Sequence, residues 1–157
     1  MNGSRNAPLY EDDFVAWLED QAGRARRGET EDLDLENIAE ELEGMVRSDR
    51  REIRSRLAVL LTHLLKCATH SKRFSSGWLG TIAEQRDGIA DLVEDSPSLR
   101  NYPAEILERC YPKARRAAAR QMRLPESALP KDCPFKVEDI LDPHWLPRRS
   151  GRSAERS

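Results

Sequence analysis

The sequence predicts an all-α protein: a helical bundle of about four to five helices with a proline-rich C-terminal strap. Apolar residues recur every three or four positions along several stretches, which is the period of one helix face. Period-two alternation, typical of a half-buried strand, is absent. Charged residues make up 34 % of the 157-residue chain and aromatic residues only 6 %. Such a composition favours helices with solvated outer faces around an aliphatic core.

The clearest helical pattern lies between Leu33 and Lys66. We expect one long or gently kinked helix that extends to about Ala68; the alternative is a break near residues 44–48. A glycine such as Gly44 costs about 1 kcal/mol relative to alanine in a helix interior, and packing can offset that cost. The apolar positions on this face are Leu35, Ile38, Leu42, Met45, Val46, Ile53, Leu57, Leu60 and Leu64.

Capping residues predict where the first two helices begin and end. Asp12 or Asp13 can start the first helix, because a short carboxylate accepts hydrogen bonds from exposed backbone N–H groups. Gly28 is a plausible end of that helix. Asp32 or Asp34 can then cap the long helix.

Prolines divide the second half of the chain. A helix that contains Trp78 is expected to end at Ser96, because the residue before proline resists the helical region. Pro103 suits the first turn of the next helix. Pro112 falls inside that helix and is expected to kink or split it, since proline lacks an N–H donor and crowds the preceding turn.

The C-terminal region is rich in proline but still contains apolar residues. We interpret residues 124–147 as an ordered strap packed on the bundle, with a short helix near residues 137–141. The predicted organisation is a single helical domain over residues 9–147, with disordered tails at residues 1–8 and 148–157.

Charge and cysteine content exclude several classes of protein. The formal net charge of −2 gives no global field for nucleic acid or for cationic partners. The longest nearly uncharged stretch, residues 57–65, is too short to span a bilayer, and the N-terminus does not resemble a signal peptide. Three widely spaced cysteines favour neither a disulfide framework nor a zinc knuckle. We therefore expect a cytoplasmic protein.

Several short motifs occur in an order that resembles a known family. They are YEDDFxxW (Tyr10–Trp17), DLEN (Asp34–Asn37), EE (Glu40–Glu41), SRL (Ser55–Leu57), HLLK (His63–Lys66), WxxTI (Trp78–Ile82), DSPSL (Asp95–Leu99) and CP (Cys133–Pro134). The sequence resembles the bacterial family catalogued as domain of unknown function 29 over residues 9–147. The resemblance implies a small all-helical domain and brings no activity, substrate or cofactor. Cys67 and Pro112 depart from the family pattern.

Arg56 and His63 are the candidate catalytic pair. Seven residues are nearly two turns of a helix, so both side chains share a face. This spacing is similar to that of helical ribonucleases of the HEPN class, in which histidine moves a proton and arginine stabilises phosphate charge. The alternative is a histidine at the edge of the core and an exposed arginine without catalytic roles.

A metal site is a weaker hypothesis, and no cofactor is expected. His63, Cys67 and His70 lie on one side of the helix if it reaches residue 70, and Glu40 could supply a fourth ligand. Imidazole and thiolate are ligands that zinc prefers. The alternative for Cys67 is a buried cysteine that behaves as a small apolar residue.

Charged clusters provide the candidate partner-binding residues. The acidic row of Glu36, Glu40 and Glu43 is interpreted as a solvated face paired with arginines on a neighbouring helix. A run without acidic residues is the better site for an acidic partner. That run contains Lys113, Arg115, Arg116, Arg120 and Arg123.

The leading functional hypothesis is a non-enzymatic protein-interaction domain that forms a homo-oligomer or binds a small protein partner, without a membrane association. The alternative hypothesis is a metal-independent, HEPN-like ribonuclease or a toxin-type protein linked to nucleic acid, using Arg56 and His63.

Overall fold

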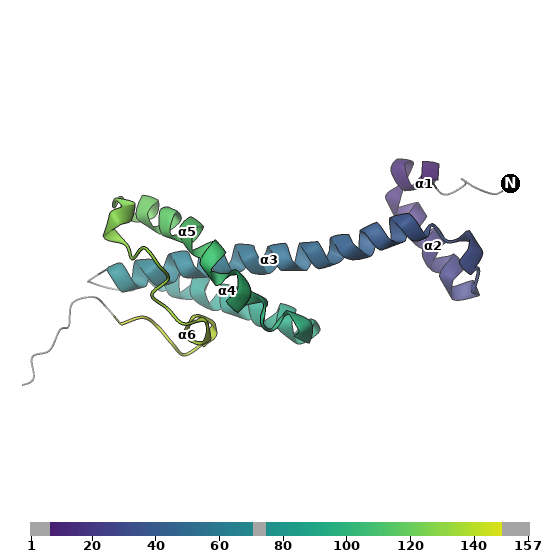
Figure 1. The fold of residues 1–157 in the computed structure, drawn as a ribbon. Helices are drawn as coiled ribbons and strands as arrows, with labels where there is room; N and C mark the ends of the chain where they lie inside the picture. The colour runs from purple at the N-terminus through teal and green to yellow at the C-terminus, as the bar shows by residue number, and fades with distance from the viewer. Residues whose placement is uncertain (1–6, 71–74, 149–157) are drawn as a thin grey trace, which may run out of the picture. The chain divides into compact units, whose positions relative to one another are not determined.

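The fold is all-α, as predicted (Figure 1). The computed structural model describes residues 7–70 and 75–148, so nearly all of the predicted tails lie outside the described residues. Within these ranges there are six α-helices and no strand. No described helix combines the length and apolar character that crossing a bilayer requires. The helices are α1 (Ala7–Asp12), α2 (Phe14–Arg27), α3 (Leu35–Thr69), α4 (Ser76–Asp95), α5 (Tyr102–Met122) and α6 (Val137–Leu141).

The chain divides into two compact units, which are described separately. Unit 1 comprises residues 1–48 and unit 2 comprises residues 49–157. The boundary falls inside α3, just after residues 44–48, where the sequence also allowed a break in the helix. α3 nevertheless continues as one α-helix from Leu35 to Thr69, as the in-phase apolar pattern favoured.

The ends of α2 in unit 1 follow from its capping residues. The Asp13 carboxylate accepts a hydrogen bond from the backbone N–H of Ala16 at 3.0 Å, which satisfies a donor that the first turn leaves unpaired. Gly28 ends the helix with a left-handed φ of 75°, a conformation that glycine adopts without steric cost. Both capping predictions are confirmed.

Polar contacts join α1 and α2 to the beginning of α3. The backbone N–H of Asp34 donates to the Gln21 side chain at 2.8 Å, and the Tyr10 hydroxyl donates to Glu41 at 2.7 Å. Tyr10 also packs edge-on against Trp17, with ring centroids 4.8 Å apart. Trp17 is the one buried apolar side chain among the described residues of unit 1.

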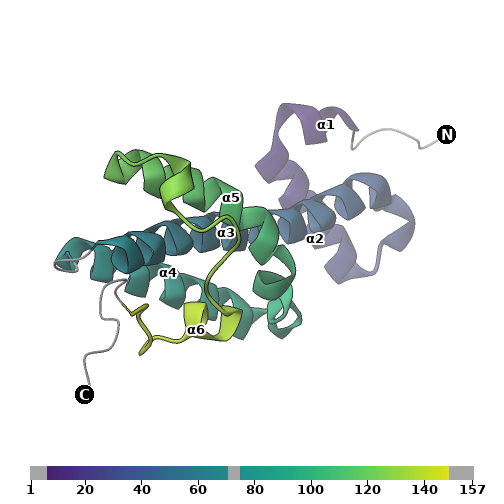
Figure 2. The same cartoon turned by 60° about the vertical axis from the view of Figure 1, so that its left-hand side comes forward.

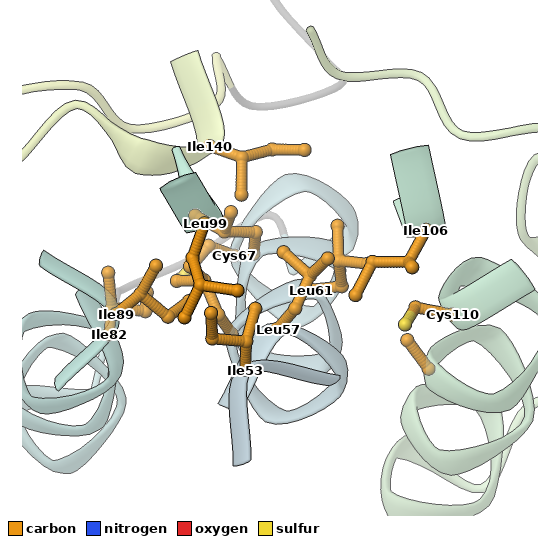
Figure 3. Packing of buried hydrophobic residues seen from close by; sticks show 13 residues of the cluster. Ile53, Leu57, Leu61, Cys67, Ile82, Ile89, Leu99, Ile106, Cys110 and Ile140 are labelled. Atoms are coloured by element: carbon orange, nitrogen blue, oxygen red, sulfur yellow. The ribbon is translucent and has the colours of Figure 1, made fainter. Parts of the chain in front are cut away.

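Unit 2 contains the hydrophobic core. Figure 3 shows the apolar face of α3 between residues from α4 on one side and residues from α5 on the other, with Ile140 of α6 above them. Burial of such side chains contributes about 1.5–3 kcal/mol each. The fully or nearly fully buried residues of this cluster include Ile53, Leu57, Leu60, Leu61, Leu64, Cys67, Ile82, Ile89, Ile106, Ala114 and Ile140.

Two of the three proline predictions are confirmed. α4 ends at Asp95, immediately before Ser96 and Pro97, and Pro103 lies in the first turn of α5. Pro112 does not split α5, which continues to Met122. Pro112 is exposed, so water can satisfy the carbonyl that lacks its helical donor.

The segment after α5 is fixed on unit 2 by a buried arginine of α4. Arg86 is 5 % exposed, and its guanidinium donates to the carbonyl oxygens of Ile140 and Trp145, each at 2.8 Å. These acceptors lie at the end of α6 and just beyond it, where helical carbonyls have no partner of their own. Figure 2 shows α6 lying beside α4. Burial lowers the pKa of Arg86.

Two residues of α5 hold the first part of the same segment. The Tyr111 hydroxyl donates to the carbonyl of Pro130 at 2.6 Å. Arg115 donates to the carbonyls of Glu126 and Leu129 at 2.6 and 3.2 Å. Leu129 is itself buried, so apolar packing and side chain-to-carbonyl bonds act together.

Replacing Arg86 tests this attachment. We expect Arg86→Met to lower the free energy of unfolding by about 2–4 kcal/mol, because buried carbonyls lose a charged donor. Urea denaturation measures the change. The control is Arg109→Met, an exposed arginine of α5, which is expected to change stability by no more than about 0.5 kcal/mol. Equal effects of the two substitutions would contradict the assigned role.

Tyr111 predicts a specific alkaline instability. Burial raises the pKa of Tyr111 to about 12 from its ordinary value of 10.0. The folded state therefore keeps a proton that the unfolded state loses, so the stabilisation is complete below pH 10 and declines above it. We expect the stability difference between wild type and Tyr111→Phe to fall by about 2 kcal/mol between pH 10 and pH 12. A pH-independent difference in urea denaturation would refute this assignment.

Candidate functional site

Arg56, the first candidate catalytic residue, connects α3 to α4. Its Nε donates to Glu52 at 3.0 Å, and its Nη1 donates to Gln85 of α4 at 3.3 Å. The guanidinium occupies the space that a β-carbon at Gly88 would need. The glycine therefore lets Arg56 lie against α4, and these contacts give the arginine a structural role.

His63, the second candidate, bonds to its own helix. Its Nδ1 lies 2.9 Å from the carbonyl oxygen of Val59, and the side chain is half-buried. No hydrogen bond joins Arg56 to His63 among the contacts of these two described residues. Their geometry therefore lends no specific support to the ribonuclease hypothesis.

The candidate metal ligands each contact different neighbouring residues. His70 packs edge-on against Trp78 with ring centroids 5.5 Å apart, and Cys67 is fully buried in the core of unit 2. Glu40, in unit 1, accepts a hydrogen bond from Arg47 of the same helix at 2.8 Å. The part of the chain that the structure describes contains no group of three or more His, Cys, Asp or Glu residues positioned to hold a metal ion.

Lys66 is a polar feature that the sequence did not single out. The lysine is 8 % exposed; its ammonium donates to Gln121 at 3.0 Å and lies 4.5 Å from the centroid of the Trp78 ring. Burial lowers its pKa. A cation–π contact and an amide oxygen thus stabilise this cation, and the lysine links α3 to both α4 and α5.

The basic residues of α5 do not all act as one surface. Arg115 is half-buried and donates hydrogen bonds to carbonyls of the segment that follows α5. Lys113, Arg116 and Arg120 are exposed. Three of the four candidate partner-binding residues are therefore exposed to solvent, and Arg115 is partly accessible. The spacing of the basic residues could not predict that Arg115 differs from its neighbours. The carbonyl oxygens that it binds belong to residues 11 and 14 positions later in the chain.

Unit 2 also has an open cavity of about 650 Å³ near the end of α3. Its lining is mostly apolar or proline, and Arg148 is the one charged residue among those that line it. None of the candidate catalytic or metal-binding residues lines this cavity. The lining includes Leu65, Ala68, Leu129, Phe135, Trp145 and Pro147.

The largest uncovered apolar surface belongs to unit 1. Of the ten large apolar side chains that are exposed among the described residues, seven lie in unit 1. Four of them follow one another on the first half of α3, with Leu35, Leu42, Met45 and Val46 exposed by 64, 59, 66 and 48 %. We call these four residues the α3 apolar face. The others are Phe14, Val15 and Leu18 of α2.

The two units also differ in charge, although the whole chain is nearly neutral. Unit 1 contains 13 acidic and five basic residues, a formal net charge of −8; unit 2 contains 15 acidic and 21 basic residues, a net charge of +6. The acidic row lies on the side of α3 away from Leu42 and Met45, and Arg47 pairs with Glu40 and Glu43 at 2.8 and 3.8 Å. These contacts are within α3, and not with a neighbouring helix as expected.

Comparison with known proteins identifies a family. A family model described as domain of unknown function DUF29 matches residues 9–146. No match was found among curated proteins, and none among solved structures.

A double-mutant cycle tests the structural role of Arg56. Gly88→Ala gains about 1 kcal/mol of helix propensity but displaces the Arg56 guanidinium. We therefore expect a gain of about 1 kcal/mol in an Arg56→Ala background and less than half of that in wild type, as measured by urea denaturation. The same gain in both backgrounds would show that Arg56 does not lie against Gly88.

Proposed function

The chain belongs to the DUF29 family, and we propose that it is a non-enzymatic protein-interaction domain whose binding surface is the α3 apolar face. The observation that supports this proposal is the imbalance between buried and exposed apolar side chains in unit 1. Its described residues include one buried apolar side chain, Trp17, and seven large apolar side chains that are exposed.

Such an imbalance is unfavourable for an isolated unit of this size. A folding unit of about 40–60 residues buries a small fraction of its surface and is only marginally stable by itself. Contiguous exposed apolar surface on a folded protein commonly marks an interaction site. Covering Leu35, Leu42, Met45 and Val46 with a partner would supply the burial that unit 1 lacks.

The charges around the surface favour a particular kind of partner. Unit 1, which carries the α3 apolar face, has a formal net charge of −8. A helix with an apolar stripe and basic flanks complements such a surface, because apolar contacts supply affinity and opposite charges orient the partner.

The proposal includes a bacterial, cytoplasmic setting. The odd number of cysteines suits a reducing compartment, and the resemblance to a bacterial family supports the proposed bacterial origin. The proposed partners are proteins.

Site-specific photo-crosslinking in producing cells tests the proposed surface. A benzophenone amino acid in place of Leu42 or Met45 is expected to form a specific protein adduct, identified by mass spectrometry. The matched control position is Leu79 of α4, which is 37 % exposed but lies outside the α3 apolar face. Adduct yields at residues 42 and 45 no greater than at residue 79 would refute the proposed function.

A further inference from the structure

We infer that the exposed face of α5 binds the phosphate backbone of a nucleic-acid duplex, without reading its base sequence. The inference goes beyond the proposed function, because it concerns unit 2 and does not depend on the α3 apolar face. It rests on a row of four cations along one side of α5, on the lack of acidic partners for them, and on the residues around them. These cations are Arg109, Lys113, Arg116 and Arg120, which we call the α5 basic stripe.

The α5 basic stripe is a straight row on the solvent side of the helix. Its members are separated by four, three and four residues, so their side chains project from one face of α5 over about 17 Å of helix axis. All four side chains are exposed. Ala114 and Ala118 lie on the opposite face and have no exposed surface. The fold therefore presents four positive charges together to solvent.

No acidic side chain of the described residues pairs with this stripe. Residues 109–125 contain six basic residues and no acidic residue. The arginines that form ion pairs within the described part of the chain are Arg24, Arg27, Arg47 and Arg56, none of which belongs to α5. The net charge of −2 for the whole chain therefore hides a local positive surface on unit 2.

Helix stability does not explain the stripe. Like charges three or four residues apart destabilise a helix by about 0.2–0.5 kcal/mol for each pair. The negative end of the helix dipole favours cations only in the last turn, so it stabilises Arg120 but not Arg109 or Lys113. An anionic ligand would remove the repulsion along the whole row.

The surroundings of the stripe extend the positive surface. Burial raises the pKa of the Cys110 thiol, and the charges of Arg54, Arg109 and Lys113 act against that rise. Arg54 of α3 is exposed and therefore adds a cation close to the first half of the stripe. The helix α4 carries exposed acidic residues and packs on the other side of α3 (Figure 3), so these charges do not neutralise the stripe.

The composition of this surface favours phosphate over an apolar partner. None of the ten large apolar side chains that are exposed among the described residues lies on α5. Protein interfaces have an apolar core, and a helix that binds a membrane surface inserts apolar residues. Charge alone is sufficient for binding a nucleic-acid backbone, because neutralising phosphates releases bound counterions.

The length of the stripe and its aromatic content favour a duplex over a single strand. About 17 Å of duplex presents about five phosphates on each strand, which matches the four cations with Arg54 beside them. Single strands are bound by stacking their bases on aromatic side chains. The aromatic residues of α5 do not provide such a platform: Tyr111 is buried, and the Tyr102 ring lies 5.6 Å from the Arg50 guanidinium.

Fluorescence anisotropy with a labelled duplex of about 20 base pairs, made as DNA and as RNA, tests the inference on the full-length chain. Wild type is expected to bind at least one duplex with a Kd of about 1–10 µM at about 50 mM salt. The logarithm of the binding constant is expected to fall with the logarithm of salt concentration with a slope of about −3.6, for four phosphate contacts. The duplex that binds more tightly identifies the source of the phosphates.

Arg116→Gln combined with Arg120→Gln is expected to weaken binding by about tenfold or more and to reduce the slope by about 1.8. Glutamine favours helix, so urea denaturation is expected to show no loss of stability. The matched control is Arg100→Gln combined with Lys136→Gln, which removes the same charge from two exposed residues of unit 2 outside α5. This control is expected to change the Kd by less than about twofold.

Equal weakening by the two double substitutions would overturn the inference, because binding would then depend on net charge and not on the stripe. Absence of binding to both duplexes at about 100 µM protein would also overturn it. Tighter binding to a glutamate peptide, to anionic vesicles or to a single-stranded oligonucleotide would assign the stripe to a different partner.

Discussion

The structure depends on covering the apolar face of one helix, α3. In unit 2 that face is enclosed by α4, α5 and α6, and residues such as Leu57 and Leu61 have no exposed surface. In unit 1 the same helix continues with its apolar period intact, but Leu42 and Met45 are more than half exposed. Burial of apolar area is the main favourable term in folding and association. The uncovered half of α3 is therefore the feature from which the proposed function follows.

Buried cations bound to uncharged acceptors hold together the elements around the covered half of α3. Arg86 binds carbonyls at the end of α6, and Lys66 binds an amide oxygen and the face of Trp78. Carbonyl and amide oxygens satisfy these donors while also gaining partners that they would otherwise lack. Burial lowers the pKa of both side chains. These contacts give both cations a structural role, as the contacts of Arg56 with α4 also do.

Much of the fold could be predicted from local signals. Asp13, Gly28 and Pro103 define helix ends through contacts within a few residues, and the period of α3 predicts one long helix. The role of Arg86 could not be predicted, because its acceptors follow more than 50 residues later. Periodicity also identifies an apolar face without saying what covers it. The net charge of −2 does not reveal that unit 1 is acidic and unit 2 is basic. That difference can be calculated only once the boundary within α3 is known.

Amide hydrogen exchange along α3 in the purified, monomeric chain tests the central claim most directly. Residues 53–67 are enclosed within one chain, so strong protection is expected there. Residues 35–48 are expected to exchange much faster, since the partner that would cover their apolar side chains is absent. Protection of residues 35–48 equal to that of residues 53–67 would contradict the claim that a second molecule completes unit 1.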